Sequence, residues 1–186
     1  MIISPNARDS LERMAVQGLR DAFARPDGGL PDVARVDDPG QGAGSHMVVL
    51  MIVSNHLRLV MALHVPDTAA SRAYFVPQGL PAGTAAERDR VFRDALSERG
   101  NMCCGMVNRA LGRFFRHTGM STPHTIDSRS GPHLRALPHQ HLAHFELAAG
   151  DAVIVRASLC VDAHEPLDFD WHDEAPAETA GELELF

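Results

Sequence analysis

A stripe of small and polar side chains lies along one face of a long predicted helix. At about 100° per residue, the carboxylates of Asp94 and Glu98 and the carboxamide of Asn101 fall within about 60° of one another. Gly105 and Gly112 continue the stripe, although each glycine costs about 1 kcal/mol of helix propensity relative to alanine. Small residues at such a cost allow another surface to approach the helix closely, either another part of this chain or a bound partner.

The other face of this helix is apolar and predicts a contact with the core. We expect the helix to run from Ala85 to His117. It starts at a capping box formed by Thr84 and Glu87, and Gly119 and Pro123 close it. Arg99 lies at the edge of the apolar face and must extend to solvent or find a partner. The expected core residues are Phe92, Leu96, Cys103, Ala110 and Phe114.

The spacing along the polar stripe resembles that of the CheC, CheX and FliY chemotaxis phosphatases. Their long helix carries Asp or Ser, then Glu and Asn at fixed intervals, usually followed by Met and Gly. The segment here reads Asp94-Ala-Leu-Ser-Glu98-Arg-Gly-Asn101-Met-Cys-Cys-Gly105, with Ser121-Thr-Pro123 downstream. The resemblance covers roughly residues 5–161. It is closer to the single-site CheX pattern, because Glu12 of the first predicted helix is followed by Ala15 at the Asn position.

The resemblance implies a cytoplasmic bacterial phosphatase of two-component signalling. Its substrate would be the phospho-aspartate of a CheY-type response regulator, and the regulator would carry the Mg²⁺, with no cofactor on this chain. Asn101 would position the attacking water, and Glu98 would pair with the regulator's active-site lysine. Further contacts with the regulator are expected from Asp94, Gly105, Asn108 and Arg90. A homodimer is also implied. The alternative is a non-catalytic CheX-like module that binds a response regulator or another signalling partner.

The composition excludes some classes of function and disfavours others. All 17 basic residues are arginine, which excludes a catalytic, Schiff-base or P-loop lysine. The net charge of −7 disfavours a nucleic-acid partner. Nine of the 24 acidic residues lie in residues 162–186, so the preceding residues carry a small positive charge. No signal peptide or membrane-spanning run is recognisable, and three cysteines, two of them adjacent, predict a reduced cytoplasmic chain.

The order of the predicted elements indicates an α+β fold with a largely antiparallel sheet packed against long helices. We expect one domain over residues 1–161 and a flexible acidic tail over residues 162–186. Besides the long helix, the predicted elements are a helix over 7–24, an exposed loop over 26–45, strands over 46–53 and 57–65, a short helix over 67–75 capped by Asp67, and strands over 137–147 and 152–161.

Three further patterns each allow two interpretations. His139, His141 and His144 are either exposed polar residues of a sheet or part of a zinc site in a metalloenzyme. The arginines on both sides of the motif form either a solvated helix face or a surface that attracts an acidic regulator. The segment 167–171 is either a docking motif or a loosely packed terminus. Cys103 and Cys104 cannot point to one site, because they lie about 100° apart around the helix, and Cys103 is expected in the core rather than at a metal or redox site.

Overall fold

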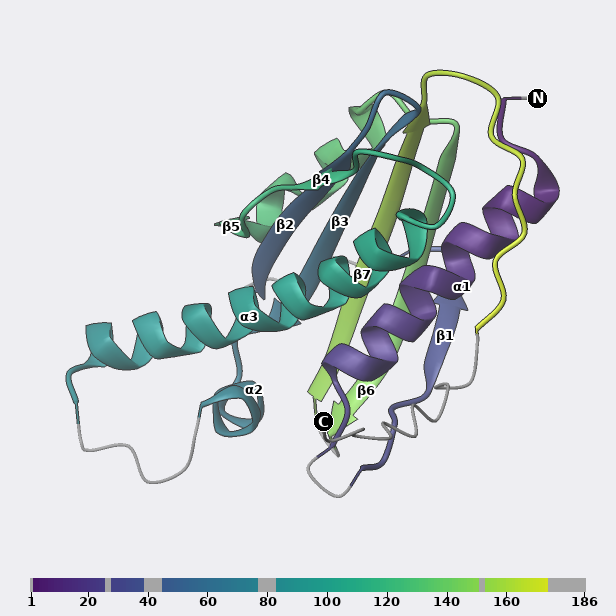
Figure 1. The fold of residues 1–186 in the computed structure, drawn as a ribbon. Coiled ribbons are helices and arrows are strands. Elements are labelled where there is room, and N and C mark those ends of the chain that lie inside the picture. The colour runs from purple at the N-terminus through teal and green to yellow at the C-terminus, as the bar shows by residue number, and fades with distance from the viewer. Residues whose placement is uncertain (1, 26–27, 39–44, 77–82, 151–152, 174–186) are drawn as a thin grey trace, which may run out of the picture.

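The computed structural model describes residues 2–25, 28–38, 45–76, 83–150 and 153–173 (Figure 1). In these residues a seven-stranded antiparallel sheet has the order β1-β6-β7-β3-β2-β4, and β5 also pairs with β2. The expected α+β class is confirmed. The strands are β1 (Val33–Val36), β2 (Ser45–Val53), β3 (Leu57–Pro66), β4 (Gly119–Met120), β5 (His124–Asp127), β6 (His141–Gly150) and β7 (Val153–Ala163).

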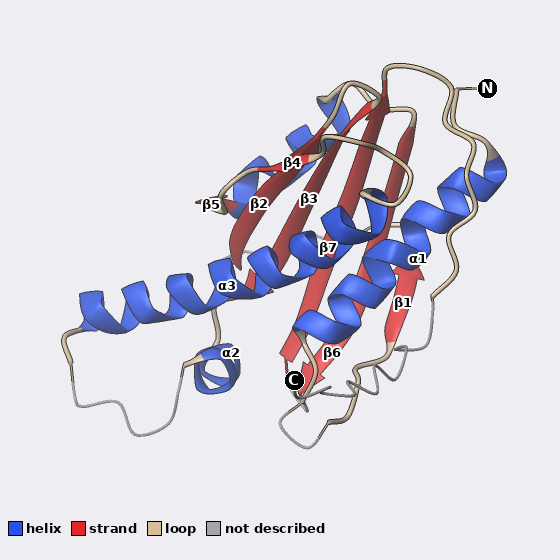
Figure 2. Ribbon diagram, viewed as in Figure 1, coloured by secondary structure: helices blue, strands red, loops and turns tan. Residues whose placement is uncertain are grey.

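Helices cover one face of the sheet more fully than the other (Figure 2). α1 (Pro5–Ala22) and α3 (Ala85–Leu111) lie across one face, and α2 (Ala69–Phe75) packs beside α3. Alternation along β2 sends Val48, Leu50 and Ile52 into the core beneath these helices. The second face is covered by the 3-10 helix η1 (Ser128–Ala136), whose Leu134 packs in a smaller cluster. Among the described residues, no helix is long and apolar enough to span a bilayer.

Two glycines let α3 pack closely. A Cβ at Gly100 would lie 2.9 Å from Leu50 Cδ1 and 3.2 Å from Val48 Cγ1, so this glycine brings the helix down onto the sheet. A Cβ at Gly18 of α1 would lie 2.9 Å from the carbonyl oxygen of Cys103, a backbone atom that cannot rotate away. The polar face of α3 is held outward by these two contacts.

The end of α3 differs from the prediction. The helix stops at Leu111 with Gly112 as its C-cap, six residues before the predicted end at His117. Phe114 is therefore not a core residue. Its side chain is 39% exposed, and its ring lies 4.7 Å from the ring of Phe169. Ala110 is only half-buried, whereas the other three predicted core residues are fully enclosed.

Other boundaries also shift. The first helix spans 5–22 rather than 7–24, and α2 is capped by Thr68 rather than Asp67. The predicted loop over 26–45 contains β1, while residues 26–27 and 39–44 lie outside the described residues. The last two strands start at His141 and Val153 rather than at 137 and 152.

The start of the expected tail belongs to the folded structure. Residues 162 and 163 complete β7, and residues 164–173 run alongside α1 in space (Figure 1). Leu167 is buried in the core and forms a bridge with Ile3, and Trp171 is only 7% exposed. We expected a flexible tail from residue 162, but residues 162–173 pack against the rest of the fold. Residues 174–186 lie outside the described residues.

Candidate functional site

The predicted site residues lie on the outer face of α3. Asp94, Glu98 and Arg90 are exposed, and Asn101 is half-buried at the edge of the same face. A Cβ added at Gly105 would meet no atom within 4 Å, so the helix backbone is open to an approaching surface there. The structure thus places these five residues on one accessible face, as the helical spacing predicted.

The polar groups of this face are not used within the fold. Within the described part of the chain, no hydrogen bond or ion pair joins the side chains of Asp94, Glu98 or Asn101 to another residue. A carboxylate or carboxamide that stabilises the fold normally has such a partner. These three side chains are therefore free to bind water or a second molecule.

α3 is a firm support for this face. The Thr84 hydroxyl accepts a hydrogen bond from the Glu87 amide at 3.2 Å, and the Glu87 carboxylate accepts one from the Thr84 amide at 2.6 Å. The hydrogen bonds that the Thr84 amide and hydroxyl donate to the Glu87 carboxylate lower the pKa of Glu87. Arg99 donates to the carbonyl oxygen of Ala22 at the end of α1, so it finds the partner that its edge position required. Side chains held on such a helix are displaced less than side chains on a loop.

The loop that begins with β4 lies beside α3 and is fixed to the sheet edge. The Ser121 amide donates to the Met51 carbonyl at 2.9 Å, and the Ser121 hydroxyl accepts from the Met51 amide at 3.0 Å. Pro123 follows, and β5 then begins at His124. β4 and β5 both contact α3, so this edge forms one flank of the candidate site.

Asn108 differs from the other predicted regulator contacts. Its side chain is half-buried near the end of α3, and its Oδ1 atom is buried with no hydrogen-bond partner among the described residues. A buried acceptor without a partner costs about 1–3 kcal/mol. Asn108 lies about 10 Å along the helix from Asn101, beyond direct reach of the same atom.

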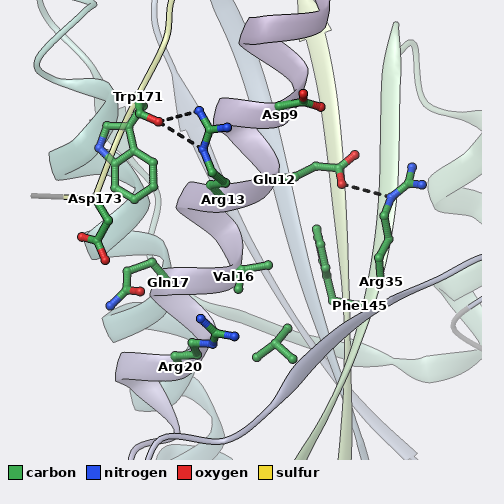
Figure 3. A pocket seen from close by; sticks show the side chains of 11 residues that line it. Asp9, Glu12, Arg13, Val16, Gln17, Arg20, Arg35, Phe145, Trp171 and Asp173 are labelled. Atoms are coloured by element: carbon green, nitrogen blue, oxygen red, sulfur yellow. Dashed lines mark hydrogen bonds and ion pairs between the residues drawn. The ribbon is translucent and has the colours of Figure 1, made fainter.

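α1 does not repeat the α3 arrangement. Figure 3 shows Glu12 turned toward Arg35, which donates to it at 3.0 Å. The buried His141 lies 3.1 Å from the other oxygen of the same carboxylate. The contact with His141 lowers the pKa of Glu12, and the nearby positive charge of Arg35 lowers it further. Glu12 is thus held by the fold, unlike Glu98.

Most of the histidines and cysteines considered as metal ligands are buried within the fold. His141 and His144 are buried rather than exposed, and His144 Nδ1 lies 2.9 Å from the Ser158 hydroxyl. His139 precedes β6, so it does not share a strand face with His141. Burial raises the pKa of the Cys104 thiol to about 12 and that of Cys103 still further. Among the described residues, no group of three His, Cys, Asp or Glu side chains is placed to hold a metal ion.

One exposed apolar residue beside this face is not among the predicted contacts. Met102 is 44% exposed and lies between Asn101 and Gly105 on the chain. Its position about 60° from Gly105 around the helix could have been read from the same helical spacing. A large exposed apolar side chain beside unpaired polar groups is typical of a protein-binding surface.

Comparisons with known proteins give a match in structure but not in sequence. No family model matches the chain, and no curated protein does. CheX in the CheX–CheY–BeF₃–Mg²⁺ complex from Borrelia burgdorferi aligns with a TM-score of 0.60, covering 83% of this chain and 96% of that chain at 13% identity. CheX from Vibrio vulnificus aligns at 0.57, covering 82% and 99% at 12% identity.

The chain has the CheX fold. A CheC-like protein from Shewanella sp. PV-4 extends the likeness, with a TM-score of 0.55 over 82% of this chain and 97% of that one at 12% identity. The alignments cover almost the whole of each of these three structures, so the likeness in fold extends over nearly all of them. At these identities the likeness concerns the fold, and the roles of individual residues remain predictions.

Proposed function

We propose that this chain is a protein phosphatase that hydrolyses the phospho-aspartate of a CheY-type response regulator. One observation carries the proposal: the motif residues Glu98 and Asn101 lie unpaired on the accessible face of α3 in a chain with the CheX fold. The Borrelia burgdorferi structure contains CheX together with CheY, BeF₃ and Mg²⁺, which supports a regulator of this type as the partner.

The proposed hydrolysis requires few catalytic groups from this chain. An acyl phosphate is reactive, so its hydrolysis mainly requires an attacking water in line with the bond that breaks. The Asn101 carboxamide accepts a hydrogen bond from that water and orients it toward phosphorus. Water forms the new bond to phosphorus as the phosphorus–oxygen bond to the aspartate breaks. The carboxylate leaves with that electron pair, and the proton that the water loses ends on the inorganic phosphate that forms. The regulator's Mg²⁺ offsets the phosphoryl charge, and no nucleophile on this chain is required.

Glu98 orients the complex. Its exposed carboxylate lies about 4.5 Å along the helix from Asn101, so one partner surface can contact both residues. In the proposal it pairs with the active-site lysine of the regulator, a residue type that this chain lacks altogether. Asp94 and Arg90 extend the contact toward the start of α3, and the open backbone at Gly105 extends it in the other direction.

The test separates the two roles. Asn101→Ala should abolish the acceleration of regulator dephosphorylation, with affinity for a BeF₃-activated regulator within about threefold of wild type. Glu98→Ala should instead raise KM more than it lowers kcat. Asn6→Ala, at an exposed position on α1, is the matched control. Full activity of Asn101→Ala would remove Asn101 from the mechanism.

A further inference from the structure

A groove of about 490 Å³ runs beside the first half of α3, on the side that faces β5. We call it the β5 groove. Figure 1 shows the start of α3 reaching past the sheet at this edge. The residues that line it are His46, Arg93, Thr125, Ile126, Asp127, Ser128 and Arg129.

Among the described residues that line the β5 groove, one cationic side chain has no charge partner. Arg129 donates to both carboxylate oxygens of Asp127 and holds the pKa of that carboxyl at about 2. His46 lies 3.3 Å from Asp67, which Arg72 also binds. Arg93, by contrast, is exposed, and among the described residues no hydrogen bond or ion pair engages it.

The position of the groove links it to the α3 face. Arg93 lies about 12 Å along the helix from Asn101 and about 80° around it, on the side toward β5. A partner surface of about 800 Å² is typical of a specific complex, and a disc of that area has a radius of about 16 Å. A globular protein that is centred on Asn101 therefore extends as far along the helix as Arg93.

We propose that the β5 groove is a second contact area for the response regulator, in which Arg93 binds a carboxylate of the receiver domain and so helps to select the regulator. The inference rests on the proposed function, because the regulator must first occupy the α3 face. A guanidinium pairs with a carboxylate through two parallel hydrogen bonds. The half-exposed Ile126 and the hydroxyls of Thr125 and Ser128 suit an acidic segment with one apolar neighbour.

The experiment compares two charge reversals in the full chain. Arg93→Glu should weaken binding to a BeF₃-activated regulator at least tenfold and raise KM by a similar factor, with kcat within twofold of wild type. Arg116→Glu makes the same change in net charge at an exposed position beyond the end of α3, and it should change affinity by less than threefold. Circular dichroism and urea unfolding check that both variants fold.

Each outcome decides a separate question. An equal loss in both variants means that only net charge matters, which overturns the local contact. No loss in Arg93→Glu, with Asn101→Ala still inactive, overturns the groove but leaves the proposed function standing. A wild-type chain that neither binds nor dephosphorylates any regulator removes the proposed function and the inference together. A regulator in which one acidic residue is changed to arginine, and which restores binding to Arg93→Glu, identifies the occupant.

Discussion

Gly105 offers a substitution that separates docking from folding. Replacing it with leucine removes a glycine from the interior of α3, which favours the helix by about 0.8 kcal/mol. The new Cβ meets no atom within 4 Å, so the first atom of the side chain adds no clash that would offset this gain. For a chain of this length, that free energy raises the melting temperature by about 2–3 °C.

The same substitution should impair the docked complex. A leucine adds four heavy atoms at a point where the proposed partner approaches the helix backbone. The surfaces must separate there, or the side chain must displace a group of the regulator. We expect at least a tenfold loss of affinity, which corresponds to about 1.4 kcal/mol. Gly105→Leu should therefore be more stable than wild type and bind the activated regulator less tightly.

Calorimetry and a binding titration check the two effects independently. Ala86→Leu is the matched control, since Ala86 is exposed in the first turn of the same helix, about 28 Å from Gly105 along its axis. It should leave affinity within twofold of wild type. If Gly105→Leu binds the regulator as tightly as this control does, the idea that Gly105 permits close approach is refuted.

Three further predictions concern the framework. Gly18→Ala should cost up to about 2 kcal/mol of unfolding free energy in urea, because the clash with the Cys103 carbonyl exceeds the helix-propensity gain; equal or greater stability would contradict the packing. Arg13→Ala removes hydrogen bonds of 2.6 and 3.1 Å to the Trp171 carbonyl and should speed hydrogen exchange at the Trp171 amide, with about 1 kcal/mol lost. Burial lowers the pKa of His64 from 6.5 to about 4. As the pH falls, the unfolded chain therefore takes up a proton at His64 before the folded chain does. Unfolding free energy should then fall by at most about 1.4 kcal/mol per pH unit from pH 6.5 down to about 4, and His64→Gln should flatten that slope.

Local sequence signals predicted the start of α3 and the position of the polar stripe on it. The Thr84–Glu87 capping box fixes the start of α3, and the spacing from Asp94 to Gly105 fixes which side chains share its outer face. Both depend on residues within a few turns of one another. For this reason, the placement of the stripe could be predicted without the rest of the fold.

Features that depend on distant partners were predicted poorly. The aromatic residues after Gly112 continue a helical pattern, but Phe114 packs on Phe169, more than 50 residues away. β1 is four residues within a loop-like segment and exists through its pairing with β6. The burial of His141 likewise depends on Glu12 of α1. No short window of sequence contains both members of these pairs.

The central claim is catalysis rather than binding, and the lifetime of a phosphorylated regulator tests it most directly. The regulator is phosphorylated with a small phosphodonor, the donor is removed, and this chain is added at one-twentieth of the regulator concentration. The account predicts that the whole phosphorylated pool decays faster, through many turnovers per chain, and that Asn101→Ala restores the intrinsic lifetime. Decay limited to the intrinsic rate, with the regulator bound but not hydrolysed, would contradict it and indicate a non-catalytic binding module.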